Sequence, residues 1–201
     1  MAPKIMSRIR KNNAALGAAV VLILFGVGTL AISLGISMYQ QATANHADVS
    51  SLLGNNPPAR PARLISGTPI HITIPSVGIS NNVIPGYYYP ATRSWTLSLN
   101  NVQYGVMSAK ANNIGGATYI YGHDRLGLFY PLSKIAPGAN ATVATANGHT
   151  FIYTYRSNVV TSPSDTSIFK YKGAPVLVLQ TCSGIWYQSR QLFIFNLTKW
   201  T

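Results

Sequence analysis

A long uncharged stretch near the N-terminus constrains this chain more than any other feature of its sequence. No charged residue occurs from Ala14 to Tyr39, and apolar residues dominate from Leu16 to Ile36. A helix of about 25 residues, rising 1.5 Å per residue, crosses a hydrocarbon core of roughly 30 Å. The stretch therefore predicts a transmembrane helix over residues 14–39.

The charges on either side of this stretch predict its orientation. The first charge downstream is Asp48, and four basic residues precede the stretch: Lys4, Arg8, Arg10 and Lys11. By the positive-inside rule, residues 1–13 form a cytoplasmic segment and everything after the helix is extracellular, so the chain is a single-pass protein of the cell membrane. A cleaved signal peptide is the alternative, because Ala42-Thr43-Ala44 has the form of a cleavage site, although signal h-regions are usually shorter, about 7–15 residues.

The sequence after the helix divides into a linker and a folded domain. Residues 40–68 hold several prolines and no sustained apolar period, a composition that predicts an extracellular tether. Residues 69–201 carry short alternating or apolar runs separated by turn residues, and Asn147-Gly148 between two such runs is a strong hairpin signal. In the first run, the isoleucines at 70, 72 and 74 predict one buried face.

The number of these runs indicates the class of fold. Strands are expected near residues 70–74, 82–84, 96–99, 118–121, 141–144, 150–155, 175–179 and 192–195. Short helical pieces fit only near residues 101–111 and 128–135. We therefore predict an all-β domain, a closed eight-stranded barrel with short helices, in which closure hides the strand edges.

Composition excludes several kinds of site. One cysteine excludes an internal disulfide framework and cysteine-based zinc or iron–sulfur sites. Three acids far apart in the chain, Asp48, Asp124 and Asp165, argue against a calcium or magnesium cage. We expect no cofactor and no metal.

The net charge of +12 needs an explanation of its own. The first 40 residues hold four of the 15 basic residues, which leaves 11 against three acids in the remainder. Because these basic residues are scattered and the domain is predicted to face outward, we interpret the charge as attraction to anionic envelope polymers or lipid head groups, and expect no nucleic-acid partner.

Cys182 is the first candidate for chemistry. It ends an apolar run just before Ser183-Gly184, and catalytic groups are often held at such strand ends by a rigid scaffold. An exported protein that keeps one unpaired thiol exposes it to oxidation, which favours a function over the alternative of a small buried side chain. A free thiol, with a pKa of about 8.5, is mostly protonated at neutral pH and needs a partner to become a nucleophile.

Histidine is the usual partner of such a thiol. His123 follows an apolar run and opens a loop, whereas His46 lies in the tether. His71 and His149 are predicted at the surface, the first opposite the isoleucines of its strand and the second at the tip of a hairpin. We therefore take His123 as the candidate base, with a structural loop histidine as the alternative.

Acyl transfer also needs a group that holds the developing oxyanion. Arg190 comes eight residues after Cys182, and antiparallel pairing of residues 176–181 with 191–195 makes the two face each other. Its guanidinium carries several N–H donors that suit a carbonyl oxygen. Arg125 is the second candidate, and an ordinary surface arginine is the alternative for both.

Taken in order along the chain, these residues resemble a known family. The motifs are Ile-Pro-Ser-Val-Gly-Ile at 74–79, Gly-His-Asp at 122–124, Val-Leu-Gln-Thr-Cys at 178–182, and Arg190. Together with the N-terminal anchor they are similar to a sortase, a membrane-anchored cysteine transpeptidase of bacterial surfaces. Phe129-Tyr-Pro-Leu132 also resembles a motif of that family. The Thr-Cys dipeptide at the end of an apolar strand, followed by an arginine that starts the next, is the most specific part.

The resemblance implies a function and roles. Cys182 would be the nucleophile, His123 the general acid/base, Arg190 the oxyanion or substrate clamp, and Thr181 would shape the pocket beside the thiol. The enzyme would cleave a C-terminal sorting signal similar to Leu-Pro-x-Thr-Gly in surface proteins or pilins. It would then join the acyl part, through a thioester, to an amine of a peptidoglycan precursor or a pilin lysine.

The sequence departs from the family in places that leave its subclass open. Gly138-Ala139 stands where the family often has Gly-Asp, and residues 41–68 lack an aromatic–acidic lid motif. Two other classes compete with a sortase. One is an L,D-transpeptidase-like cell-wall enzyme, whose Ser-x-Gly-Cys run differs from Gln180-Thr181-Cys182-Ser183. The other is a non-catalytic surface binding or structural module, for which Tyr87-Tyr88-Tyr89 and Trp95 supply an adhesive patch.

Overall fold

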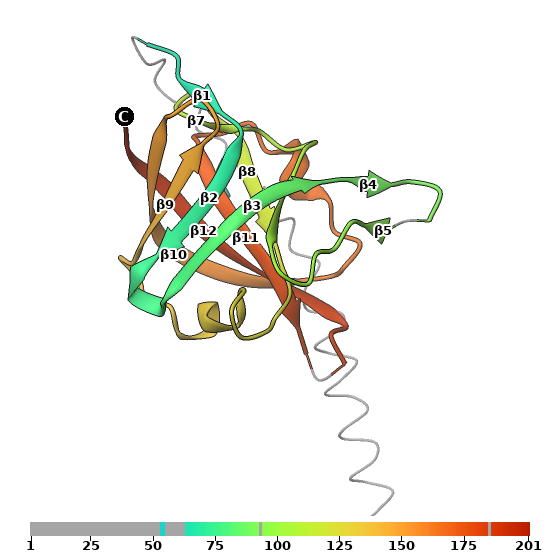
Figure 1. Cartoon of the computed structure of the whole chain (residues 1–201). Coiled ribbons are helices and arrows are strands. Elements are labelled where there is room, and N and C mark those ends of the chain that lie inside the picture. Colours follow the sequence, from blue (N-terminus) through green and yellow to red (C-terminus); the bar gives the residue numbers. More distant parts are fainter. Residues whose placement is uncertain (1–52, 55–62, 93, 185) are drawn as a thin grey trace, which may run out of the picture. The chain divides into compact units, whose positions relative to one another are not determined.

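A computed structural model describes residues 53–54, 63–92, 94–184 and 186–201. Within them the dominant feature is a closed barrel of eight strands (Figure 1), so the predicted all-β barrel is confirmed. Around the barrel the strands follow the order β10 (Thr150–Thr161), β12 (Ser189–Trp200), β11 (Val176–Ser183), β8 (Ala117–Tyr121), β6 (Val102–Gly105), β3 (Ile79–Gly86), β2 (Pro69–Ile74) and β9 (Asn140–Thr145).

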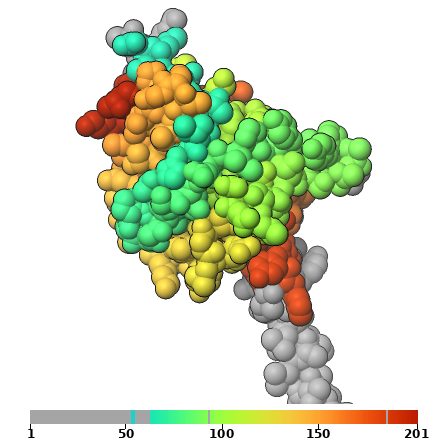
Figure 2. All heavy atoms as spheres, in the orientation of Figure 1, coloured from blue at the N-terminus to red at the C-terminus, as the bar shows by residue number. Residues whose placement is uncertain are grey.

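Smaller elements decorate the barrel. A two-residue pair joins β1 (Ser66–Gly67) to β7 (Ala111–Asn112), and a short hairpin joins β4 (Tyr88–Tyr89) to β5 (Ser94–Trp95). Figure 2 shows this hairpin, in green, standing out from the surface of the barrel. The described residues also form three 3₁₀ turns: η1 (Pro75–Val77), η2 (Tyr130–Lys134) and η3 (Ser167–Lys170).

Two parallel pairings interrupt an otherwise antiparallel barrel. They join β8 to β11 and β3 to β6. The hairpin predicted at Asn147-Gly148 forms between β9 and β10, where Gly148 adopts a φ of 83° that favours glycine. Strands β10 and β12 are longer than predicted, at 12 residues each, and their pairing closes the barrel.

Alternation along each strand produces two apolar clusters. The barrel interior is filled by fully buried side chains such as Ile72, Phe129, Leu177, Leu179 and Phe193. A second cluster lies on the outer face over β8, β11 and β12, and it includes Tyr119, Tyr121, Val178, Leu192 and Ile194. Strands that are buried on both faces read as continuous apolar runs, as Val176–Leu179 does.

Three local predictions are wrong. Residues 96–99 are not a strand. The Ser98 N–H donates to the Gln103 side-chain oxygen instead of to a neighbouring strand, and Gln103 Nε2 donates to Thr96 Oγ1. Residues 101–111 contain β6 rather than a helix, since its pairing with β3 and β8 overrides helical propensity. Ile70 is exposed, because a register shift between Pro69 and His71 breaks the alternation with Ile72 and Ile74.

The two predicted helical segments outside the barrel strands have different outcomes. The short helix expected near 128–135 is present as η2. The predicted transmembrane helix at 14–39 and most of the tether lie outside the described residues. Within the residues that are described, no helix has both the length and the apolar character that a membrane span requires.

Candidate active site

Cys182 lies near the end of β11 on the outer face of the barrel. Strand alternation puts it in line with Val178, a member of the outer cluster, whereas Leu177 and Leu179 point into the core. Its thiol is free and half-buried. A strand buried on both faces therefore holds the sulfur rigidly at the edge of the outer cluster.

The parallel pairing of β8 with β11 brings the candidate base beside this cysteine. Tyr121 pairs with Gln180, and the Gly122 N–H continues the ladder by donating to the Gln180 carbonyl at 3.0 Å. His123 is the residue after Gly122, so the loop that carries it begins beside the end of β11, where Cys182 lies. The His123 carbonyl accepts a bond from the Phe129 N–H at 3.2 Å, which ties the loop to a buried ring.

Arg190 faces Cys182 on the other side, as the sequence predicted. The two residues are direct partners in the antiparallel pairing of β11 with β12. Arg190 also precedes Leu192 and Ile194 on the outer face, so its side chain starts on the same face as the thiol. Its Nη1 donates to the Tyr187 and Ser189 carbonyls at 2.9 and 3.0 Å, while Nη2 and Nε carry further N–H donors.

Thr181, the neighbour of Cys182 in β11, makes a hydrogen bond to the chain that carries His123. It is buried on the opposite face of β11 from Cys182, and its hydroxyl donates to the Gly122 carbonyl at 3.0 Å. Because Gly122 immediately precedes His123, this bond braces the chain that carries the histidine. Thr181 thus acts on the geometry of the site from the barrel interior.

An aromatic wall beside the site was not identified from the sequence. Tyr119 and Tyr121 line β8 on the outer face, and Trp95 from β5 packs on both rings, with centroids 6.1 and 5.2 Å away. Phe169 from η3 stacks on Trp95 at 5.6 Å and meets Tyr119 edge-on at 5.1 Å. The one available signal was the spacing Tyr119, Tyr121, His123, which puts the three residues on one side of an extended chain.

Tyr119 links this wall to the candidate triad. Its hydroxyl donates to the Gln180 side-chain oxygen, two residues before Cys182. Burial, above all, raises the pKa of the Tyr119 phenol far beyond its usual range. Tyr121 and Cys182 add to this effect, and the positive charge of Arg190 opposes it. The phenol is therefore a neutral hydrogen-bond donor that orients Gln180 at neutral pH.

Glycines allow the aromatic rings to approach the barrel. A Cβ on Gly86 would stand 2.2 Å from the Tyr121 hydroxyl, and one on Gly105 would stand 3.0 Å from the Tyr119 ring. Tyr121 in turn donates from its hydroxyl to the Thr96 carbonyl at 2.9 Å. The wall is thus fitted into the barrel surface and tied to the end of the β4–β5 hairpin.

The other residues considered from the sequence lie elsewhere. His71 contacts Asn82 and Ser80 on neighbouring β3, and His149 contacts the Thr201 carbonyl, while His46 is outside the described residues. Arg125 is exposed in the loop after His123. In the described part of the chain, no group of three His, Cys, Asp or Glu side chains is placed to hold a metal ion.

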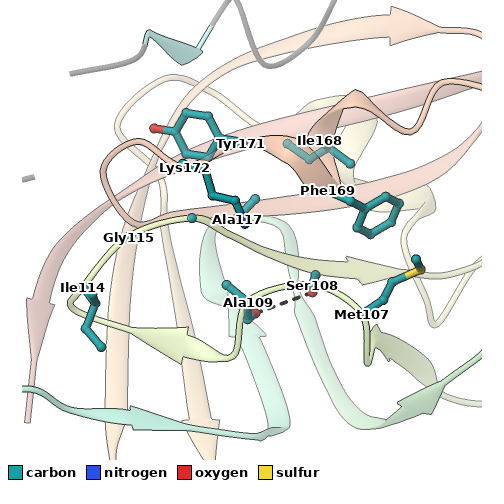
Figure 3. A pocket seen from close by; sticks show the side chains of 11 residues that line it. Met107, Ser108, Ala109, Ile114, Gly115, Ala117, Ile168, Phe169, Tyr171 and Lys172 are labelled. Atoms are coloured by element: carbon teal, nitrogen blue, oxygen red, sulfur yellow. Dashed lines mark hydrogen bonds between the residues drawn. The ribbon is translucent and has the colours of Figure 1, made fainter. Parts of the chain in front are cut away.

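A cavity of about 590 Å³ opens further along the same outer face (Figure 3). It lies between the segment 107–117 and η3 with its following residues, and its lining includes Met107, Ile114, Ile168 and Lys172. Phe169 lines the cavity and also belongs to the aromatic wall, so the two features are adjacent.

Comparison with known proteins shows the family of this chain. The sequence pattern of the sortase domain matches residues 72–196, which include all three residues of the candidate triad. This chain belongs to the sortase family. No curated protein sequence matches the chain.

Solved sortase structures share the fold. Sortase E1 from Streptomyces coelicolor, solved with a tripeptide in its active site, superposes with a TM-score of 0.54 at 20% identity, over 67% of this chain and 90% of that one. Sortase A from Corynebacterium diphtheriae superposes with a TM-score of 0.53 at 18% identity, over 67% of this chain and 62% of that one. Sortase C1 from Streptococcus agalactiae superposes with a TM-score of 0.51 at 22% identity, over 64% of this chain and 66% of that one. The chain thus spans less than two thirds of the last two proteins, and the likeness extends to sortases of several classes.

Proposed function

We propose that this sortase is a cysteine transpeptidase and that Cys182, His123 and Arg190 perform its chemistry. The observation that supports this most is the strand register around the free thiol. Cys182 and Arg190 are partners across β11 and β12, and the loop that carries His123 begins beside the end of β11, where the Gly122 N–H donates to the Gln180 carbonyl.

The first half of the proposed reaction forms an acyl-enzyme. The Cys182 sulfur, as a thiolate, attacks the carbonyl carbon of the threonine in a Leu-Pro-x-Thr-Gly-like signal, and free N–H groups of Arg190 hold the oxyanion. The C–N bond then breaks, and the departing amine takes a proton from His123. The product is a thioester between Cys182 and the upstream part of the substrate.

The second half releases the joined product. An amine from a peptidoglycan precursor or a pilin lysine attacks the thioester and gives up a proton to His123, and the Cys182 thiolate leaves. Atoms and charges balance without a cofactor or a metal. The proposed substrates are surface proteins or pilins that carry a sorting signal.

The anchor belongs to the same proposal. We place residues 14–39 across the cell membrane with residues 1–13 in the cytoplasm and the barrel outside. Enzyme, substrate and acceptor then share one surface, which raises their effective concentration. Protease added to intact cells should remove the barrel and leave the N-terminal segment protected, and a barrel resistant to protease until the cells are lysed would contradict this orientation.

One experiment tests the chemistry. The full chain is incubated with a library of sorting-signal peptides and triglycine or a lysine amine, and the products are identified by mass spectrometry. Cys182→Ala should abolish the joined product, and His123→Ala should lower the rate on the order of 10²–10⁴-fold. His71→Ala and His149→Ala are matched controls, because both histidines contact groups away from the site. Product formation by Cys182→Ala would exclude the assignment.

A thiol-reactive probe separates the enzyme from a non-catalytic module. Cys182 should react with an activity-based label in the native protein and lose this selectivity in His123→Ala. A module without catalysis should show ordinary thiol reactivity that His123→Ala leaves unchanged.

A further inference from the structure

Two loops at the site end of the barrel carry unusually exposed apolar side chains. Because β8 and β11 run parallel, the loops that follow them, residues 122–129 and the described residues 184 and 186–188, emerge at the same end. Trp186 is 81% exposed and Leu126 is 77% exposed, the two highest values among the exposed large hydrophobic residues of the described chain. Tyr187, next to Trp186 in the same loop, is 60% exposed. We call these three residues the loop-tip patch.

The first loop is built so that Leu126 points into water. The Arg125 carbonyl accepts bonds from the N–H groups of Leu128 and Tyr130, so the loop forms a defined turn. Leu128 and Phe129, only two and three residues further on, are buried in the core. Burying a leucine side chain contributes about 1.5–3 kcal/mol to the free energy of folding. In this loop Leu126 does not make that contribution, whereas Leu128 does.

The second loop is also held in place. The Tyr187 N–H donates to the Gly184 carbonyl at 3.0 Å, and the Trp186 N–H donates to the Gln188 side-chain oxygen at 2.9 Å. Arg190 holds the Tyr187 carbonyl, and Tyr187 has a φ of 55°, a left-handed conformation that is uncommon outside glycine. Hydrogen bonds therefore maintain a strained turn that presents Trp186 and Tyr187 outward.

The charges around the patch are mainly positive. Arg125 precedes Leu126 in the first loop and Arg190 stands at the base of the second loop, whereas Asp124 is the one acid in the described residues of these loops. Figure 2 shows both loops, in yellow and orange-red, on the lower side of the domain. A surface that combines cations with Trp, Tyr and Leu has the composition of a protein region that meets an anionic lipid interface.

We propose that the loop-tip patch docks on the surface of a bilayer that contains anionic lipid. The side chains stand out from the protein instead of lining a hollow, which distinguishes the patch from a peptide groove. Three side chains also fall well short of the roughly 800 Å² per partner that a stable second copy requires. Trp186 and Tyr187 lie at the head-group level with Leu126 below, and the flanking cations contact lipid phosphates.

Docking of this kind has a consequence for catalysis. It directs the Cys182 end of the barrel toward the membrane, where a membrane-held substrate and a lipid-linked acceptor are located. This consequence rests on the proposed transpeptidase function, whereas docking itself does not, so the two can fail separately.

Tryptophan quenching by lipid tests the docking in the full chain. The protein is reconstituted in vesicles of phosphatidylcholine and phosphatidylglycerol that contain brominated phosphatidylcholine. The chain has three tryptophans, at positions 95, 186 and 200, and none lies in the predicted membrane helix. Trp200 ends the 12-residue strand β12, about 36 Å from its start, and is the matched control at the other end of the barrel.

The expected results follow from this placement. Trp186→Phe should remove most of the quenching, Trp200→Phe should leave it unchanged, and Leu126→Asp should weaken the quenching of Trp186. Retention of quenching in Trp186→Phe would overturn the proposal. Equal quenching in pure phosphatidylcholine vesicles would overturn the assignment of an anionic surface.

Two further controls keep the result interpretable. Unchanged circular dichroism of each variant shows that the barrel is folded. If sorting-signal peptide without lipid shields Trp186 from a soluble quencher, and lipid does not, the patch binds substrate and the membrane assignment is wrong.

Discussion

The two faces of strands β8 and β11 differ in what covers them. Inward, Ile120, Leu177 and Leu179 are enclosed by the barrel itself and are fully buried. Outward, Tyr119 and Tyr121 are also buried, but their cover is Trp95 from the β4–β5 hairpin and Phe169 from η3. The inner face is thus closed by the sheet, and the outer face by short segments from loops.

This difference separates stability from function. Side chains closed in by eight strands stabilise the fold, because removing one leaves a cavity that the sheet cannot collapse. The segments on the outer face have fewer partners, since β4 and β5 contain two residues each. They contribute less to the free energy of unfolding, and they form the wall beside Cys182.

The largest effect on stability is expected from the inner face. Phe193 is almost completely buried on β12, and Phe193→Ala should lower the free energy of unfolding by about 3–5 kcal/mol. Urea denaturation measures this, with Phe193→Leu as the milder control. A loss below about 1 kcal/mol would mean that the interior collapses readily, and the contrast between the faces would disappear.

Substitutions in the outer aromatic wall should cost less stability and more activity than substitutions in the barrel interior. Trp95→Ala removes ring contacts with Tyr88, Tyr119, Tyr121 and Phe169 but leaves the barrel intact. We expect a loss of about 1–3 kcal/mol in stability. The kcat/KM for the peptide substrate should fall by more than the loss of folded protein accounts for.

Tyr89 supplies the control for this variant. It lies in the same hairpin and is about half exposed, so Tyr89→Ala should change stability by less than about 0.5 kcal/mol. If Trp95→Ala and Tyr89→Ala reduce kcat/KM equally, the hairpin and not the aromatic wall determines activity.

Thr181 connects the two faces, because its hydroxyl is inside while it braces the chain of His123. Thr181→Val keeps the shape and leaves the Gly122 carbonyl without its donor, at an expected cost of about 1–2 kcal/mol. Thr181→Val should therefore also lower activity, whereas Thr181→Ser keeps the hydroxyl and should retain activity. If the serine variant is as inactive as the valine variant, the methyl group and not the hydrogen bond positions the site.

The smallest effect concerns Asp124, next to His123. Desolvation raises the pKa of the Asp124 carboxyl above its usual 3.8. The folded state therefore keeps this proton to a higher pH than the unfolded state, so the associated stability is present below 3.8 and is lost as pH rises through the raised value.

Asp124→Asn should flatten this part of the stability profile. Unfolding in urea across the acidic range measures it, and added salt should leave the difference in place because desolvation, not a charge partner, is the cause. If the free energy of unfolding of Asp124→Asn depends on pH as it does in the original protein, Asp124 does not contribute to this pH dependence.

Local patterns along the chain were enough to predict most of the barrel. Strand β2, the β9–β10 hairpin and the end of β11 follow from alternation, Asn147-Gly148 and a continuous apolar run. Predictions failed where a partner outside the segment overrides its local preference. Gln103 organises residues 96–98, and pairing with β3 and β8 makes residues 102–105 a strand.

The candidate triad shows the same division. The sequence alone placed Arg190 opposite Cys182, because two strands joined by a short loop pair as neighbours and their register can be counted. It could not determine that the loop carrying His123 begins beside the end of β11, since β8 and β11 are parallel strands separated by more than 50 residues. Parallel pairing depends on the closure of the whole barrel, so tertiary structure decided where the His123 loop starts and which aromatic rings form the wall beside the thiol.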